Sequence, residues 1–314
     1  MKRKTIQTKI IILFFLINLM VASCSSIEGA TLSAPQSLDL TNDRALTRTA
    51  NTNVATNTNT PETILTSTST PIPPQITRTQ TPTPTSTWVY NEPGNVNVPI
   101  LLYHHIEDNP TASRYSVSIT DFHSQMKALY DSGYKTIPIS LFLDALLKGA
   151  DLPEKAVVIT FDDGHQSVYD NAFPIMQAFG FTGVAYVVAN RINDIPDFLN
   201  IATLKEMIAA GWEVGSHSYT HVDLTVNHQR VSQEIAYSKI DLEKALSIKV
   251  QTFAYPFGLM DSYLAQKVSQ YGYRAGMGLG TRKTHTVSNL FYLDRIEIYG
   301  DLSLDDFRQI FIDY

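Results

Sequence analysis

The sequence predicts an α/β fold, a closed or nearly closed (β/α) barrel with seven or eight parallel strands. From residue 96 to the C-terminus, short apolar runs alternate with amphipathic stretches of helical period. Strands that alternate with helices favour a parallel sheet, and this number of strands is enough to close a barrel. An open doubly wound sheet is the alternative. Its nucleotide-binding form is disfavoured because the chain after the first predicted strand reads YHHIEDNP, without a glycine-rich loop.

The individual elements follow from apolar runs and from helical periodicity. The predicted strands are residues 99–105, 134–139, 156–163, 182–189, 212–218, 250–257, 273–279 and 293–298. The predicted helices are residues 120–133, 140–149, 170–180, 202–211, 229–246 and 261–272. Several of these helices end at a glycine, as helix C-caps do: Gly133, Gly149, Gly180, Gly211 and Gly272.

The N-terminal residues predict export. Lysine and arginine precede an apolar run from Ile10 to Ala22 that is short for a membrane span, as in a signal peptide. The end of this run, VASC, resembles the lipobox of bacterial lipoproteins. The resemblance implies a signal peptide over 1–23, lipidation of Cys24 and a position on the extracytoplasmic face of the cell membrane. An ordinary signal peptide or an uncleaved anchor is the alternative. No other cysteine is present, which excludes disulfides and cysteine chemistry from the folded part.

Residues 24–95 are predicted to form a disordered linker rich in Thr, Pro and Asn, followed by a catalytic domain over 96–314. Of the 50 residues from 41 to 90, 17 are threonine, and such a segment cannot bury enough apolar surface to fold. The linker would hold the domain away from a membrane. The formal charge is -6 and no basic run follows the N-terminus, so nothing favours nucleic acid as a partner.

Three of the predicted strands end in polar, titratable residues. In a (β/α) barrel the carboxyl ends of the strands meet at one mouth, where catalytic groups lie. The three strand ends are Tyr103-His104-His105, Asp162-Asp163 and Ser216-His217. Because Gly164 follows the two aspartates, the chain turns there and both carboxylates can reach one cavity. Capping of the next helix by these acids is the alternative.

A histidine pair four residues apart, His217 and His221, lies in the segment GSHSYTH. Two imidazoles and one carboxylate form a complete protein ligand set for a catalytic Zn²⁺-type ion. Chance spacing would produce the same pair. A non-haem iron oxygenase uses the same ligand types, but those sites are usually found on all-β barrels.

Three motifs, TFDDG, SHSYTH and FAYPFG, occur in this order along the chain. Together they resemble the successive motifs of the polysaccharide deacetylase family, carbohydrate esterase family four. The resemblance implies a distorted (β/α) barrel and a metal-dependent hydrolase. It implies Asp162 as the catalytic base, and as metal ligands Asp163, His217 and His221. The implied cofactor is a divalent ion, Zn²⁺ before others.

The motif FAYPFG implies a substrate and oxyanion role for Tyr255, through its main-chain N–H, and for Pro256. A proline-containing turn that packs two aromatic rings is the alternative. Many relatives carry an arginine in this motif that orients the base, where this chain has Ala254. Arg295, on the last predicted strand, could supply that group, although an arginine in a strand is more often a surface or ion-pair residue.

The general acid is the remaining role. The family's usual C-terminal histidine is missing after Arg295, and PILLYHHI resembles the N-terminal histidine segment of the poly-N-acetylglucosamine deacetylase branch, in which the motif order is permuted. This resemblance implies His104, and strand alternation predicts that His105 points away from the mouth. His285, in TRKTHTV, is the alternative.

The function implied is removal of N-acetyl groups from N-acetylglucosamine units of a polysaccharide. Two rivals remain. One keeps the fold but hydrolyses an acetyl ester on an acetylated polysaccharide. The other is a carbohydrate-binding domain without activity, which the presence of all four acidic and imidazole groups disfavours.

Overall fold

The computed structural model describes residues 87–108, 113–193 and 195–312. The predicted signal peptide, Cys24 and most of the predicted linker lie outside these residues. Within the described part of the chain, no helix is long and apolar enough to cross a membrane.

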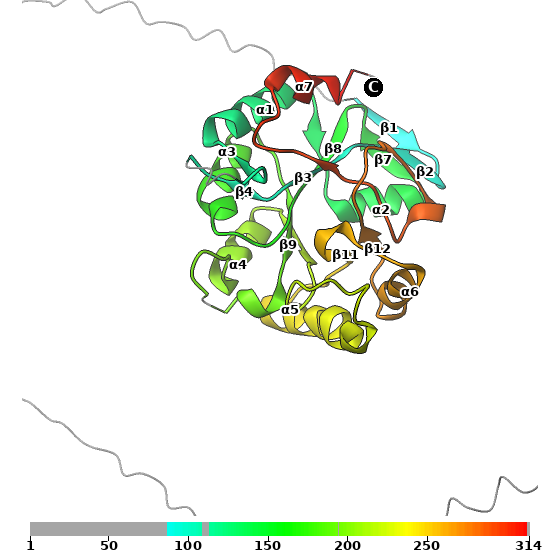
Figure 1. Cartoon of the computed structure of the whole chain (residues 1–314). Coiled ribbons are helices and arrows are strands. Elements are labelled where there is room, and N and C mark those ends of the chain that lie inside the picture. Colours follow the sequence, from blue (N-terminus) through cyan, green and yellow to red (C-terminus); the bar gives the residue numbers. More distant parts are fainter. Residues whose placement is uncertain (1–86, 109–112, 194, 313–314) are drawn as a thin grey trace, which may run out of the picture. The chain divides into compact units, whose positions relative to one another are not determined.

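A curled sheet forms the centre of the domain (Figure 1). Its strand order is β12-β11-β10-β9-β8-β3-β14, and β6 pairs separately with β8. Every pairing within it is parallel. The strands are β3 (Ile100–Tyr103), β6 (Lys135–Thr136), β8 (Ala156–Phe161), β9 (Val184–Val187), β10 (Glu213–Ser216), β11 (Thr252–Ala254), β12 (Ala275–Met277) and β14 (Ile296–Glu297).

The two edges of this sheet are joined by the segment that leads into β14. Leu293 pairs with Met277 in a parallel bridge and accepts a hydrogen bond from Gly278 N–H. Two residues on, Arg295 O accepts a hydrogen bond from Gly280 N–H. The prediction of a distorted (β/α) barrel is confirmed, with a chain segment in place of a full strand at the closure.

Helices surround the strands in Figure 1. They are α1 (Ile119–Asp131), α2 (Ile139–Lys148), α3 (Phe173–Ala178), α4 (Ile201–Ala209), α5 (Ser238–Leu246), α6 (Ser262–Gln270) and α7 (Leu304–Gln309). The predicted helix over 229–246 is helical throughout, but it begins with a 3-10 turn at His228–Arg230 and a π-helical segment at Ser232–Tyr237. The short helix α7 was not predicted.

Residues of β8 alternate between two buried layers. Val157, Ile159 and Phe161 belong to the core between sheet and helices. Val158 belongs to the second core, inside the curled sheet. Because both faces are buried, the strand reads as a continuous apolar run, typical of parallel sheets. Because side chains two residues apart share a face, the face of β8 that includes Val158 leads to Asp162 at the mouth.

The folded part begins earlier than the sequence predicts. Strand β1 (Trp88–Asn91) pairs antiparallel with β7 (Ala150–Pro153), and β2 (Asn95–Asn97) pairs antiparallel with β13 (Thr284–Thr286). The predicted linker boundary at 95 is therefore wrong, because residues 88–95 belong to the domain. These strands are short: β1 is exposed along most of its length, and β2 has only three residues, so neither gives a recognisable apolar pattern in the sequence.

Candidate active site

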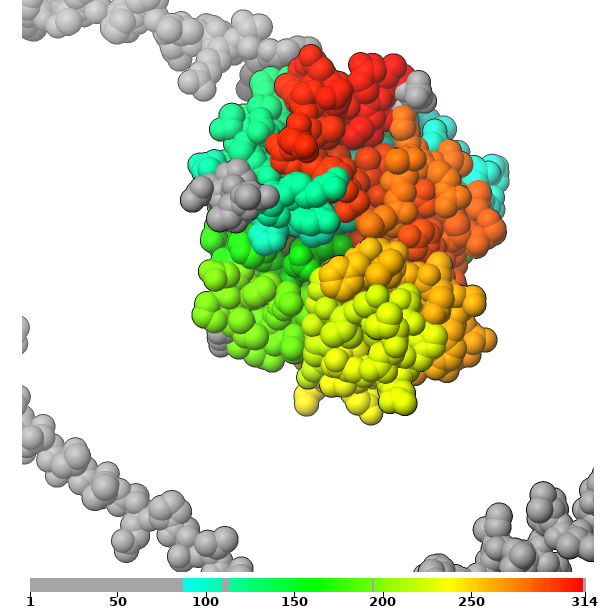
Figure 2. All heavy atoms as spheres, viewed as in Figure 1, coloured from blue at the N-terminus to red at the C-terminus, as the bar shows by residue number. Residues whose placement is uncertain are grey.

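A cavity of about 260 Å³ opens at the carboxyl ends of the parallel strands. Its titratable lining comes from segments far apart in the sequence: His104, His105, Tyr115, Asp162, Asp163, His217, His221 and Glu297. In Figure 2 the surface around residues 100–120 (teal), that around 220–260 (yellow to amber) and that of the C-terminal third (orange to red) meet on one face of the domain. The predicted convergence of strand ends on one mouth is thus what the fold produces.

Asp163, His217 and His221 converge around one point of this cavity. The Oδ1 atom of Asp163 lies 3.2 Å from Nε2 of His221 and 3.7 Å from Nε2 of His217. Ligands on a tetrahedral ion, with bonds of about 2.0–2.2 Å, are separated by roughly 3.3–3.6 Å. Asp163 Oδ1 is buried and has no hydrogen-bond partner among the described residues. The three groups therefore fit a divalent ion such as Zn²⁺.

His217 is held in the orientation that a ligand needs. Its ring is buried, and Nδ1 lies 2.9 Å from the carbonyl oxygen of Ala254, to which it donates. This hydrogen bond fixes the tautomer and leaves the lone pair of Nε2 directed at Asp163. Burial, and then the neighbouring His217, lower the pKa of His221, which keeps its imidazole neutral and able to coordinate a metal.

The backbone at the mouth is strained. Among the described non-glycine residues, those with left-handed φ include Asp163 (69°), Ser218 (67°), His221 (61°) and Phe257 (60°), and all four lie at or beside the cavity. Such conformations cost on the order of 1–3 kcal/mol each and are typical of functional sites. At Asp163 the strain reverses the strand alternation, so Asp162 and Asp163 both reach the cavity.

Asp162 forms a buried bidentate ion pair with Arg295. The two guanidinium nitrogens lie 2.6 and 2.7 Å from the two carboxylate oxygens, and both side chains are buried. Burial alone would raise the pKa of Asp162, but the charge and hydrogen bonds of Arg295, together with the neighbouring His217 and His104, outweigh it and hold the pKa at about 2. Asp162 is therefore ionised at neutral pH, and its orientation is set by Arg295.

Arg295 contacts the predicted base Asp162, as the sequence suggested for a replacement of the arginine missing at Ala254, whereas Tyr255 and Pro256 do not lie where contact with substrate was predicted. None of the three lines the cavity. The main-chain N–H of Tyr255 donates to Met277 O in the sheet, and its hydroxyl donates to Phe291 O. An N–H used in a sheet ladder is not free for an oxyanion, so the Tyr255 prediction is wrong. Phe257, two residues later and exposed, lines the cavity instead.

Both His104 and His105 line the cavity, which contradicts the prediction that only His104 would reach it. Strand β3 ends at Tyr103, so the alternation stops before the two histidines. The His104 ring packs against Tyr115 at 4.8 Å between centroids. Burial lowers the pKa of His104, and the charges of Asp162 and Asp163 oppose this shift.

His285 lies away from this chemistry. It is buried on β13, its ring packs edge-on against Phe142, and it does not line the cavity. Burial lowers its pKa to about 4. The structure thus removes the alternative in which His285 donates a proton to substrate.

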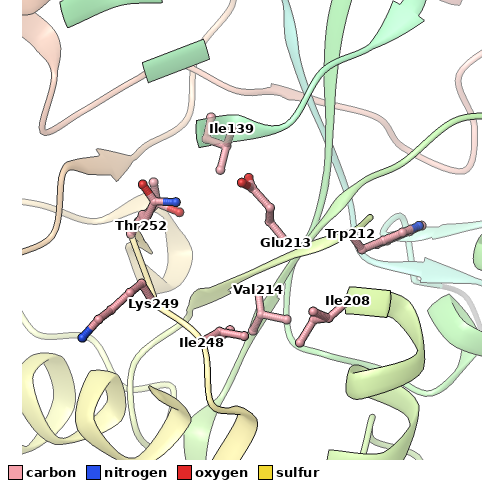
Figure 3. A pocket seen from close by; sticks show the side chains of 9 residues that line it. Ile139, Ile208, Trp212, Glu213, Val214, Ile248, Lys249 and Thr252 are labelled. Carbon is pink, nitrogen blue, oxygen red and sulfur yellow. The ribbon is translucent and has the colours of Figure 1, made fainter. Parts of the chain in front are cut away.

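A second cavity, of about 160 Å³, lies at the amino ends of β10 and β11. Figure 3 shows its lining: the carboxylate of Glu213 points toward Ile139, and the aliphatic side chains Ile208, Val214 and Ile248 lie on the other side. With one acid and no imidazole it offers no catalytic constellation.

Comparisons with known proteins indicate the kind of domain to which this site belongs. Residues 149–276 match the family model for polysaccharide deacetylase. A poly-beta-1,6-N-acetyl-D-glucosamine N-deacetylase of Staphylococcus aureus is 28% identical over 201 residues, which cover 60% of this chain and 69% of that protein. A polysaccharide deacetylase structure from Bacillus cereus has a TM-score of 0.62 and 27% identity, and the match covers 69% of each chain.

A third relative is the Streptococcus pyogenes deacetylase PplD, solved in complex with acetate, with a TM-score of 0.62 and 25% identity. The match covers 68% of this chain and 98% of that one. Fold and comparisons together define the class as hydrolases that act on carbon–nitrogen bonds other than peptide bonds. The chain therefore contains a polysaccharide deacetylase domain of the carbohydrate esterase family four type, to which residues 149–276 match.

Proposed function

We propose that this protein is an exported, metal-dependent enzyme that removes N-acetyl groups from N-acetylglucosamine units of a polysaccharide. The observation that carries the proposal is the convergence of Asp163, His217 and His221 beside the buried, ionised Asp162 in one open cavity. The similarity to the staphylococcal deacetylase supports the choice of an N-acetylated glucosamine polymer.

In this proposal Asp163, His217 and His221 hold the metal. When bound, a divalent ion, Zn²⁺ in our proposal, polarises the amide carbonyl and lowers the pKa of water in the site. Asp162 accepts the proton of the attacking water, because it is ionised and its carboxylate lies 3.7 Å from Nε2 of His217, beside the ligand cluster. Arg295 is a positioning residue that holds both oxygens of Asp162 in place.

His104 is the proposed general acid. An amine anion is a very poor leaving group, so amide hydrolysis needs a proton donor, and an imidazole near its pKa suits this step. His104 lines the same cavity as the two aspartates, with its ring held by Tyr115. For the oxyanion we propose the main-chain N–H of Phe257, because Phe257 lines the cavity and its backbone there is left-handed.

Acetate release from a panel of acetylated glycans tests the proposal. The full chain should release acetate from N-acetylglucosamine polymers, and His217→Ala should lose both bound metal and activity. Asp162→Asn should keep the metal and lose turnover. If acetate is released only from O-acetylated glycans, the substrate bond is an ester and the proposed amide hydrolysis is wrong. Metal loss in Asp162→Asn with retention in Asp163→Asn would exchange the roles of the two acids.

The cellular position is a separate proposal, supported by the apolar N-terminal run and VASC. We infer a lipid anchor at Cys24 on the extracytoplasmic face of the membrane, with the threonine-rich segment as a tether. Wild-type protein should partition with membranes, and Cys24→Ser should be released or fail to mature. Equal membrane association of the two proteins would count against lipidation.

A further inference from the structure

A second group of metal-ligating side chains borders the cavity and has no role in the proposed reaction. His105, Glu107 and His165 each offer one ligand atom, and these atoms all lie within 4.8 Å of one another. All three residues are half-buried. None of them belongs to the cluster of Asp163, His217 and His221, so the two groups can be altered independently.

The backbone holds the two sides of this second group together. His105 begins the short strand β4 (His105–Ile106), which pairs with β5 (Ser116–Val117). His165 lies in the turn that follows β8. Ile106 N–H donates to Ser167 Oγ at 3.1 Å, which ties β4 to that turn. A second bond, from Asn171 Nδ2 to Ile106 O at 2.7 Å, fastens the same strand to the segment after His165.

The side chains converge without bonding to one another. The rings of His105 and His165 lie 4.2 Å apart between centroids. Nδ1 of His105 is 4.0 Å from Oε1 of Glu107, which is too far for a hydrogen bond. Two imidazoles and a carboxylate that meet at such separations leave room for an ion between them.

Each outer ligand also has a partner on its far side. Ser116 Oγ donates to Oε1 of Glu107 at 2.9 Å, and Ser167 Oγ lies 2.8 Å from Nδ1 of His165. Metal ligands in proteins are commonly oriented by such second contacts. The main-chain N–H of Ser167 also donates to Nδ1 of His165 at 3.3 Å, so the neutral ring carries its proton on Nε2, and His165 must change tautomer or lose that proton to bind an ion.

We propose that His105, Glu107 and His165 bind a second divalent cation of the Zn²⁺ class at the rim of the active-site cavity. Two imidazoles with one carboxylate suit Zn²⁺ and neighbouring transition metals better than Mg²⁺ or Ca²⁺, which prefer oxygen ligands. The groups need to close by roughly 1 Å to reach the ~3.3–3.6 Å separations of a tetrahedral site. This rearrangement and the partial exposure predict weaker binding than at Asp163, His217 and His221.

The ion should be detectable without any assay of activity. In the full chain carrying His217→Ala and His221→Ala, equilibrium dialysis against Zn²⁺ followed by metal analysis should find one equivalent bound. Adding His165→Phe should remove that equivalent. Glu107→Gln, which keeps the size of the side chain, should weaken it at least tenfold. His123→Ala, which alters an exposed histidine of α1 outside both groups, should leave it unchanged.

The visible absorption of Co²⁺ in the same variants gives a second readout, because imidazole coordination changes its spectrum. Absence of bound Zn²⁺ in the His217→Ala/His221→Ala chain would overturn the proposal. Binding that survives both His165→Phe and Glu107→Gln would also overturn it, since the ion would then lie elsewhere. If the His165→Phe chain does not fold, the Zn²⁺ affinity of the Glu107→Gln chain decides whether the second site exists, and an unchanged affinity would overturn the proposal. Loss of the first ion leaves this result untouched, so the two metal proposals fail separately.

Discussion

The two ends of the barrel carry cavities of different character. At the carboxyl ends of the strands, the lining of the cavity includes four histidines, two aspartates and a glutamate. At the amino ends, the cavity is lined mainly by aliphatic side chains, and its one acid, Glu213, already accepts a hydrogen bond from Ser140 N–H at 3.2 Å. Strand β10 begins at Glu213, which lines the amino-end cavity, and ends at Ser216, directly before His217 at the mouth.

The difference arises from how the chain leaves the strands. At the carboxyl end, Asp163, Ser218, His221 and Phe257 take left-handed backbone conformations that turn side chains into the cavity. At the amino end of β10, the chain arrives from α4 through Gly211, whose positive φ needs no strained side-chain-bearing residue. Left-handed backbone also occurs at Ser247, directly before Ile248 at the amino-end cavity, but four of the six such non-glycine residues in the described chain lie at the mouth, together with the buried charge.

The largest effect should follow from breaking the Asp162–Arg295 pair. Arg295→Met leaves a buried carboxylate without its partner, so the free energy of unfolding should fall by about 3–5 kcal/mol. Chemical denaturation measures this loss. Adding Asp162→Asn should recover part of it, because the charge is then gone. Lys127→Met, at an exposed pair with Asp131, should cost less than about 1 kcal/mol. An equal loss of unfolding free energy in Arg295→Met and Lys127→Met would contradict the expectation that the buried pair at the mouth contributes more than the exposed pair.

A buried titratable group far from the mouth, His285, should affect the pH dependence of folding stability. Its pKa is about 4 in the fold and about 6.5 when unfolded, so the unfolded chain binds more protons between these values. Stability should therefore fall as pH drops from about 6.5 to about 4, by up to roughly 3 kcal/mol from this residue. Asp294 and Arg282 are the charges that act on it.

Denaturation curves at several pH values measure this dependence. His285→Leu should reduce the loss of stability between pH 6.5 and 4, and should leave deacetylation at neutral pH unchanged. A large loss of activity in this variant would return His285 to the catalytic candidates.

His104→Ala should lower deacetylation by roughly 10² or more, a typical contribution of a general acid. Metal content should stay the same, since His104 is not in the ligand cluster. Steady-state kinetics with metal analysis checks both. His105→Ala is the matched control and should be much milder. If the His105 variant is the inactive one, the assignment of the acid is wrong.

The smallest effect is expected at the amino-end cavity. Lys249 borders it, and its side chain is 87% exposed. Lys249→Ser should change stability by no more than about 0.5 kcal/mol and should not alter turnover. A marked loss of activity here would show that chemistry is not confined to the mouth.

Much of the site could be predicted because its residues follow recognisable strands. The apolar run of β8 ends at Asp162 and Asp163, and β10 ends just before His217, so parallel packing brings them to one mouth. The second group could not be predicted in this way. Glu107 and His165 lie in turns, and only the pairing of β4 with β5 and its bonds to the turn after β8 bring them near His105.

The sequence by itself determined the alternation of strands and helices, the polar strand ends and the order of the three motifs. These are local properties, set by side-chain type and spacing along the chain. The tertiary structure decided which groups pair. It joined Arg295 to Asp162 across 133 positions of sequence, used the Tyr255 N–H in the sheet, and added residues 88–95 to the domain. Such contacts depend on how distant segments close the sheet, and a period of two or 3.6 residues carries no information about that closure.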